Sequence, residues 1–140
     1  MKNYLEWIGT PFNYGKFHKQ ISCDCFGLFV GILYEKYPNN KMVKEILEIF
    51  IELYHKPLIC FTKIHDILHK YSTKLQKILP NELIVLKKSS RFHCGITVVY
   101  NNEIYVLHAC EKHGVILTSL QRFLLFGIIF EKYGIFFKKL

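Results

Sequence analysis

The chain has 140 residues, of which 51% are hydrophobic and 16% are aromatic, and its formal net charge is +8. This composition excludes an intrinsically disordered chain, and the length predicts one domain that spans residues 1–140. No apolar run reaches the ~20 residues that a membrane-spanning helix needs, so we expect no transmembrane segment.

The opening residues contain one lysine but no continuous apolar stretch, which predicts synthesis in the cytoplasm without a secretion signal. The lysines are scattered rather than gathered in a dense block with exposed aromatic residues, so we expect no nucleic-acid partner. The five cysteines are irregularly spaced, and a reducing compartment would keep them as free thiols.

The first half of the chain carries the hydrophobic periodicity of helices. Apolar residues recur at helical spacing in four segments, which are residues 2–8, 25–37, 41–55 and 63–72. Asp24 stands directly before the second segment and suits an N-terminal cap. Residues 12–22 lack this periodicity and are predicted to be extended or looped.

Beyond Pro80 the pattern changes to short runs rich in β-branched and aromatic residues, which predict strands. These runs cover residues 82–88, 92–100, 103–110 and 114–120, and residues 123–137 predict one or two further strands. Asn101 and Asn102 separate two of the runs and predict a tight hairpin turn. The sequence therefore predicts an α+β fold, with N-terminal helices packed on a C-terminal antiparallel sheet of about five strands.

Cys25 is a candidate nucleophile because it opens the helix that Asp24 is expected to cap. The unpaired N–H groups at a helix N-terminus carry partial positive charge, which favours thiolate over thiol. The same N–H groups can stabilise an oxyanion that forms during a reaction. One position would thus supply both the attacking sulfur atom and part of an oxyanion hole.

A nucleophilic cysteine also needs a base, and the base needs an orienting partner. His93 lies at the start of one predicted strand and His108 near the end of the next. If Asn101 and Asn102 form the hairpin turn, the two histidines lie side by side at one end of the sheet. Cys25 would meet them if its helix packs end-on against that edge.

A zinc site is the chemical alternative, because His93, Cys94, His108, Cys110 and His113 fall within a short segment. Adjacent residues of a strand point to opposite faces, so His93 and Cys94 do not readily bind the same ion. We therefore expect no metal and no cofactor.

Two other features are interpreted without a catalytic role. His65 and His69 are four residues apart, a spacing that can bind metal, but a solvated helix face is the simpler interpretation. Cys23 is expected to be a bystander thiol, because a Cys-x-Cys disulfide is strained. It could still trap Cys25 by oxidation.

Four short motifs follow one another along nearly the whole chain, and they are "WIGTPF" from Trp7, "DCFGL" from Asp24, "HCGI" from His93 and "HA" from His108. Together they resemble the NlpC-type cell-wall cysteine peptidases, a papain-like family, and in particular its phage and gene-transfer-agent subgroup. The resemblance implies that Cys25 is the nucleophile, His93 the general base and His108 the residue that orients His93. It also implies cleavage of an amide bond in peptidoglycan stem peptides, with phage-like tail proteins as partners and a location on the virion or tail.

Several motif positions bear on the substrate side of this expected site. Phe12 stands where the family has a tyrosine, and Tyr14, on the same face of an extended segment, is predicted to supply the missing hydroxyl. Phe26 replaces a serine and predicts a more apolar subsite. Asp24 is expected to be the helix cap and, by the resemblance, an anchor for a substrate amine. Two alternatives stay open, which are a degenerate tail-assembly or wall-binding module and a papain-like acyltransferase.

Overall fold

The computed structural model describes residues 2–71, 73–74, 78, 80–89 and 91–134. Its helices are α1 (Lys2–Leu5), α2 (Cys25–Lys36), α3 (Lys41–Leu53), α4 (Pro57–Tyr71), α5 (Leu120–Phe123) and the 3-10 turn η1 (Leu124–Phe126). Its strands are β1 (Phe17–His18), β2 (Ser22–Cys23), β3 (Thr73–Lys74), β4 (Glu82–Lys88), β5 (Arg91–Tyr100), β6 (Glu103–Cys110), β7 (Gly114–Ser119) and β8 (Ile128–Gly134).

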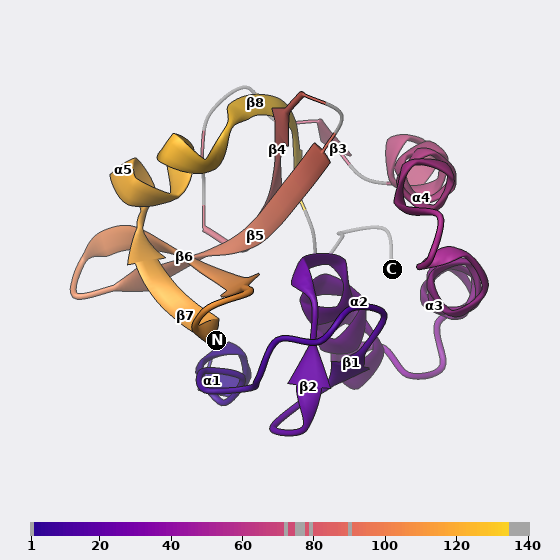
Figure 1. Ribbon diagram of the computed structural model, residues 1–140, viewed down its shortest axis with the longest axis horizontal. Coiled ribbons are helices and arrows are strands. Elements are labelled where there is room, and N and C mark those ends of the chain that lie inside the picture. Colours follow the sequence, from indigo (N-terminus) through magenta and orange to yellow (C-terminus); the bar gives the residue numbers. More distant parts are fainter. Residues whose placement is uncertain (1, 72, 75–77, 79, 90, 135–140) are drawn as a thin grey trace.

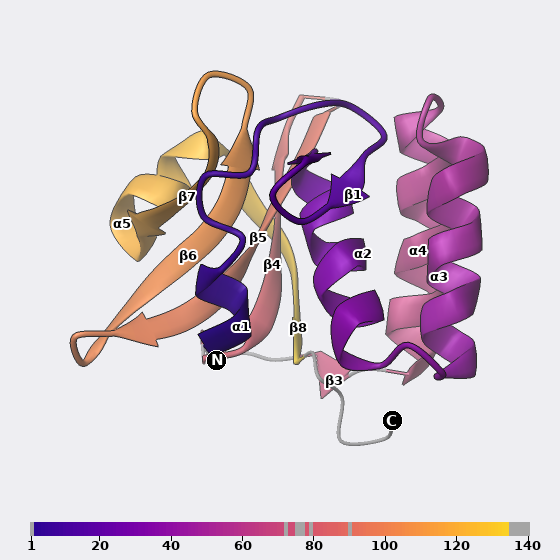
Figure 2. The same cartoon turned by 90° about the horizontal axis from the view of Figure 1, so that it is seen from below.

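The chain is α+β, with an antiparallel sheet flanked by helices. Six strands pair in the order β3-β8-β4-β5-β6-β7, and β1 and β2 form a separate antiparallel pair. α2 lies on one side of the sheet with α3 and α4 beyond it, whereas α5 lies on the other side (Figure 1). The start of α2, the β4–β5 turn and the β6–β7 turn lie at the same end of the molecule (Figure 2).

Asp24 starts α2 as the sequence predicts. Its backbone is extended, and its carboxylate accepts hydrogen bonds from the N–H of Gly27 at 2.6 Å and of Gly15 at 2.7 Å. A cap of this kind typically stabilises a helix by about 1 kcal/mol. Because one of its two donors lies in the preceding loop, Asp24 also ties that loop to the first turn of α2.

Gly27 is required where the same loop crosses the helix. A Cβ atom built at this position would lie 1.8 Å from the backbone carbonyl oxygen of Lys16. The absence of a side chain therefore lets the loop pack directly on α2. The loop between α1 and β1 is held against the start of α2 by this contact and by the Asp24 cap.

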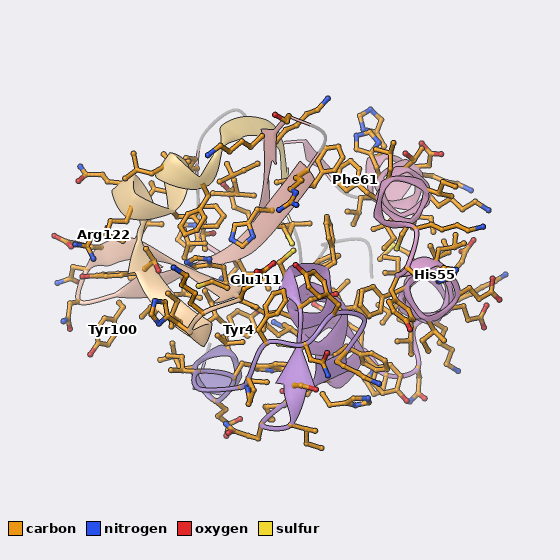
Figure 3. The ribbon with its side chains drawn as sticks, in the orientation of Figure 1. Tyr4, His55, Phe61, Tyr100, Glu111 and Arg122 are labelled. Carbon is orange, nitrogen blue, oxygen red and sulfur yellow. The ribbon has the colours of Figure 1, made fainter. Side chains whose placement is uncertain are left out.

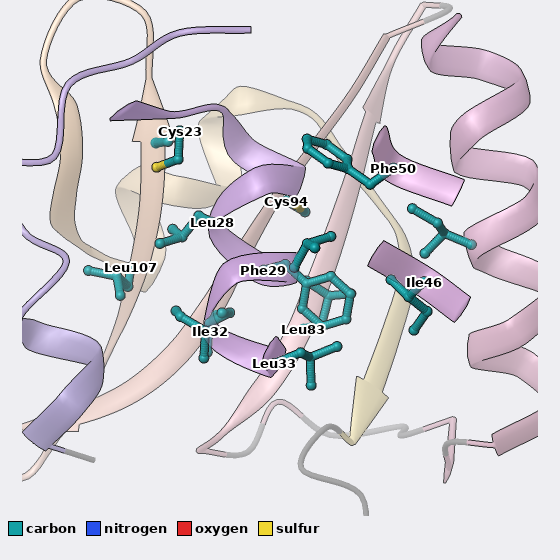
Figure 4. Packing of buried hydrophobic residues seen from close by; sticks show 14 of the residues in the cluster. Cys23, Leu28, Phe29, Ile32, Leu33, Ile46, Phe50, Leu83, Cys94 and Leu107 are labelled. Carbon is teal, nitrogen blue, oxygen red and sulfur yellow. The ribbon is translucent and has the colours of Figure 1, made fainter. Parts of the chain in front are cut away.

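The main core lies between the sheet and α2, with α3 and α4 behind that helix (Figure 4). Phe29 and Leu33 of α2 are buried against Phe50 of α3 and Leu83 of β4. Each such side chain contributes roughly 1.5–3 kcal/mol when fully removed from water. A smaller apolar cluster on the opposite face of the sheet contains Phe123 of α5.

The expected arrangement of helices followed by about five strands is wrong in its order and its strand number. β1 and β2 precede α2, α5 follows β7, and the main sheet has six strands. Residues 120–126 turn helical because the Ser119 hydroxyl caps the N–H of Arg122 at 3.4 Å, so only β8 forms in the segment predicted as one or two strands. Residues 135–137 of that segment lie outside the described residues. α4 begins at Pro57, six residues before the predicted start, because proline suits the first helical position.

Candidate active site

Cys25 is the first residue of α2, and its side chain is half-buried between the helix and β5. Hydrogen bonding with the Cys94 thiol and with the His93 imidazole, together with the charge of His93, holds the pKa of Cys25 well below its usual value of 9.0, although burial acts in the opposite direction. Cys25 therefore carries its negative charge at pH values where ordinary thiols are protonated.

His93 and His108 meet on one face of the sheet, as the predicted hairpin requires. β5 and β6 pair with Ile96 opposite Leu107, which makes the two histidines diagonal neighbours on that face. The Nε2 atom of His93 lies 2.9 Å from the Nδ1 atom of His108. His93 thus stands between the sulfur of Cys25 and the ring of His108.

Thr118 of β7 extends this row of hydrogen bonds. Its hydroxyl lies 2.8 Å from the Nε2 atom of His108. Burial and the charge of His93 lower the pKa of His108 to about 3, so His108 stays neutral at physiological pH. The network then assigns its single proton to Nε2, which donates to Thr118, and leaves Nδ1 to accept from His93. This assignment fixes the orientation of the His93 ring and turns its other nitrogen to Cys25.

Two aromatic rings enclose the histidine pair from the α5 side. The centroid of Phe123 lies 5.5 Å from that of His93 and 5.0 Å from that of His108, and the corresponding separations for Phe126 are 5.1 and 5.2 Å. Phe123 is fully buried, whereas Phe126 is exposed. The rings exclude water from one side of His93 and explain the burial that lowers the pKa of His108.

Tyr14 lies at the rim of the site. The residue is 63% exposed, and its ring packs edge-on against Phe12, with ring centroids 4.9 Å apart. Its hydroxyl donates a hydrogen bond to Glu111 of the β6–β7 turn, and Glu111 lies between the sheet and the start of α2 (Figure 3). That bond raises the pKa of Tyr14, whereas the charge of Arg91 lowers it.

The predicted substrate residues Asp24 and Phe26 flank Cys25. Both carboxylate oxygens of Asp24 accept backbone hydrogen bonds, and burial raises its pKa to about 6, so the helix cap accounts for this residue. The ring of Phe26 packs against Phe61 of α4, with centroids 5.5 Å apart, and Phe61 stacks on Phe92 at 3.9 Å. An apolar aromatic wall therefore stands beside the sulfur.

The structure brings Cys25, His93 and His108 together, as the sequence predicts, and surrounds them with residues that were not predicted. The position of Thr118 could have been predicted, because the turn at 111–113 fixes a register in which Thr118 is a diagonal neighbour of His108. No sequence pattern predicts the positions of Phe123, Phe126 and Glu111, since α5 and the α1–β1 loop reach the site only through tertiary packing.

The site thus lines up a thiol, two imidazoles and a hydroxyl on an α+β fold. This arrangement is typical of enzymes that use a cysteine nucleophile with a histidine base. The sequence model of the Zc3h12a-like Ribonuclease NYN domain matches residues 22–123, well over half of the chain, and the chain belongs to this family. The matched segment includes Cys25, His93, His108 and Thr118. No curated protein matches the chain.

Family membership overturns the resemblance to the NlpC-type peptidases. The predictions of a papain-like fold, a peptidoglycan peptidase, an acyltransferase and a wall-binding or tail-assembly module are wrong, as are the stem peptide and phage-like tail proteins as partners. The expectation of no nucleic-acid partner is wrong as well, because the family is one of ribonucleases. Four short motifs specify a local chemistry, whereas the family match extends over a long continuous segment.

None of the described helices could span a membrane, and the cellular location stays a prediction.

Phosphodiester cleavage is often assisted by divalent metal ions, which need several converging carboxylate or imidazole ligands. Among the residues that the structure describes, no three His, Cys, Asp or Glu side chains converge in a way that could hold an ion. Cys110 and His113, part of the zinc alternative, form no such group with the histidine pair. The described residues therefore do not fit a metal centre.

Proposed function

We propose that this chain is a ribonuclease whose phosphodiester-cleaving site consists of Cys25, His93 and His108. Family membership supports RNA as the substrate. The observation that carries the site is the position of His93, whose Nε2 atom lies 2.9 Å from the Nδ1 atom of neutral His108 and whose imidazole lowers the pKa of Cys25. A thiolate beside an imidazolium is a nucleophile with a proton donor already in place.

Positive charge beside the site supports an anionic substrate. Arg91 lies two residues before His93 on β5, so both side chains leave the same face of the strand. Arg91 is exposed, and its charge acts on the Tyr14 hydroxyl across the site rim. A guanidinium group there can bind a phosphate through two hydrogen bonds. The net charge of +8 attracts an RNA backbone over longer distances.

The proposed reaction has two steps. In the first, the Cys25 thiolate attacks phosphorus, an S–P bond forms, the bond from phosphorus to the 5′-oxygen breaks, and the His93 imidazolium protonates that oxygen. In the second, His93 takes a proton from water, the resulting hydroxide displaces sulfur from phosphorus, and the thiolate–imidazolium pair is restored. The products are a 3′-phosphate and a 5′-hydroxyl.

The remaining groups position the reactants. The first turn of α2 directs N–H groups toward the place where the phosphoryl oxygens would lie, and phosphates bind readily at helix N-termini. His108 holds the His93 ring through the bond to its Nδ1 atom, so it is a positioning residue. Phe26 offers an apolar surface beside the reacting phosphorus.

A cleavage assay on a fluorescent single-stranded RNA tests the proposal. Wild-type protein is expected to cleave the RNA, and Cys25→Ala to lower the rate by at least about 100-fold. Cys60→Ala is the matched control, because Cys60 is a buried thiol of α4 and it is expected to leave the rate unchanged. A deoxyribose at the scissile nucleotide is expected to be tolerated, since the 2′-hydroxyl takes no part.

Two results would contradict different parts of this proposal. Folded wild-type protein that leaves RNA intact would remove RNA as the substrate. Products that end in a 2′,3′-cyclic phosphate would show attack by the 2′-hydroxyl, and Cys25 would then not be the nucleophile.

A further inference from the structure

A second thiol lies against the proposed nucleophile. Cys94 follows His93 on β5, and its thiol donates a hydrogen bond to the backbone carbonyl oxygen of Cys25, with 3.2 Å between Sγ and O. Strand alternation turns Cys94 toward α2, where it packs in the same core cluster as residues of that helix, and turns His93 toward the opposite face.

The two thiols differ in accessibility and in acidity. Cys25 is half-buried, and its thiolate is the favoured form. Cys94 is fully buried, and burial together with the Cys25 charge raises its pKa well above the usual value. An oxidant from solvent therefore reacts first at Cys25, which leaves Cys94 as a reduced neighbour.

Cys23 is a poor alternative partner despite its sequence position. Its backbone pairs with Phe17 in the β1–β2 ribbon, and its side chain is fully buried in the core. The Cys94 thiol, by contrast, already lies on the backbone carbonyl oxygen of Cys25, so an oxidative trap by Cys94 suits the geometry better than the expected trap by Cys23.

We propose that Cys94 is a resolving cysteine, which closes a disulfide with Cys25 after a peroxide has oxidised Cys25. This inference goes beyond the proposed function and does not depend on RNA as the substrate. The disulfide would remove the nucleophile reversibly and would protect Cys25 from irreversible oxidation.

The chemistry balances with hydrogen peroxide as the only co-reactant. The Cys25 thiolate attacks one peroxide oxygen, the O–O bond breaks, and Cys25 becomes a sulfenic acid while hydroxide leaves. The sulfur of Cys94 then attacks the sulfenic sulfur, an S–S bond forms and the S–O bond breaks. The Cys94 proton leaves with the sulfenic hydroxyl as one water, and the hydroxide from the first step becomes the second water with the proton that Cys25 had given to His93. Two thiols and one peroxide thus give one disulfide and two waters.

Mass spectrometry of the full-length protein after brief treatment with dilute hydrogen peroxide tests this inference. Remaining thiols are alkylated, and the protein is digested with trypsin. Cys25 lies in the peptide of residues 20–36, together with Cys23, and Cys94 lies in the peptide of residues 92–112, together with Cys110. The expected product is a cross-link between these peptides, which dithiothreitol reverses.

Three variants assign the cross-link to its cysteines. Cys23→Ser and Cys110→Ser are expected to retain it, whereas Cys94→Ser is expected to lose it and to accumulate Cys25 sulfinic acid that dithiothreitol does not restore. A wild-type protein that forms sulfinic acid without a cross-link, or a cross-link that survives Cys94→Ser, overturns the inference. The wild-type digest alone decides the question if Cys94→Ser does not fold. Because the readout is mass, failure to cleave RNA leaves the result interpretable.

Discussion

The molecule contains two close histidine pairs that share little except the distance between their rings. The ring centroids of His93 and His108 are 5.1 Å apart, and those of His65 and His69 are 5.2 Å apart. The first pair bridges two strands, is nearly perpendicular at 81°, and is joined by a nitrogen–nitrogen contact of 2.9 Å. The second pair lies one turn apart on α4, with its rings stacked at 22°.

The difference shows that orientation and surroundings, rather than proximity, give a histidine pair its chemistry. In the strand pair, burial keeps His108 neutral and the edge-on geometry directs a nitrogen of each ring at the other. In the helical pair, the i,i+4 spacing places the rings face to face, and His69 is exposed. The comparison predicts large effects at one pair and small effects at the other.

The largest effect is expected for His93→Ala. Without the imidazole, the Cys25 thiol loses a hydrogen bond and a positive charge that lower its pKa, and the leaving oxygen loses its proton donor. RNA cleavage should fall by about 100-fold or more. Alkylation of Cys25 by iodoacetamide at about pH 6.5, below the ordinary thiol pKa, should slow as well. His65→Ala is the matched control, and equal losses in both variants would remove the distinction between the pairs.

A smaller effect is expected for His108→Ala, because His108 acts only through the position of His93. Misplacement of a reacting group by about 1 Å can cost about 100-fold, and we expect a loss up to that size. His108→Asn should restore part of the rate, since its amide oxygen can accept the hydrogen bond from His93. If the alanine and asparagine variants are equally slow, a positioning role for His108 is refuted.

The buried position of His108 predicts a pH-dependent stability. Its pKa is about 3 in the folded chain and 6.5 in the reference state, so the unfolded chain binds the extra proton between these values. The contribution of His108 to the free energy of unfolding should therefore be largest above pH 6.5. It should fall as the pH drops toward 3, by at most about 1.4 kcal/mol per pH unit.

Urea unfolding from pH 7 to pH 4 measures this slope. Asp24 works in the opposite direction, because its raised pKa of about 6 favours the folded chain as the pH falls. The difference between wild type and His108→Asn isolates the histidine, and His69→Ala is the control. Parallel curves for wild type and His108→Asn would contradict a buried neutral His108.

The smallest effects are expected at the helical pair. His69→Ala removes an exposed ring from α4, and surface substitutions of this kind usually change the free energy of unfolding by less than about 0.5 kcal/mol. RNA cleavage should be unchanged. A clear loss of cleavage would place α4 in the functional site.

The local features of the site were predictable from the sequence, and its assembly was only partly so. Asp24 before an apolar helical run predicts the cap at Cys25, and Asn101 with Asn102, both at positive φ, predicts the hairpin that aligns His93 with His108. The contact of Cys94 with Cys25 depends on how α2 packs across β5. That packing is set by many side chains of the core together, and no local pattern encodes it.

The family could not be derived from the site residues. A cysteine with two histidines specifies a nucleophile, a base and an orienting group, and unrelated folds can supply such a set. The prediction of a peptidase inferred a complete activity from these few residues. The family match covers residues 22–123, a much longer stretch than the four motifs, and it supports RNA as the substrate.

The row of hydrogen bonds from Thr118 to Cys25 also has a consequence for biosynthesis. The ribosome adds Cys25 to the chain before His93, His108 and Thr118. The groups proposed to activate the sulfur are therefore absent when Cys25 is made, and the nascent thiol keeps its ordinary reactivity. We expect the sulfur to become a strong nucleophile only when β5 and β6 have paired beside α2.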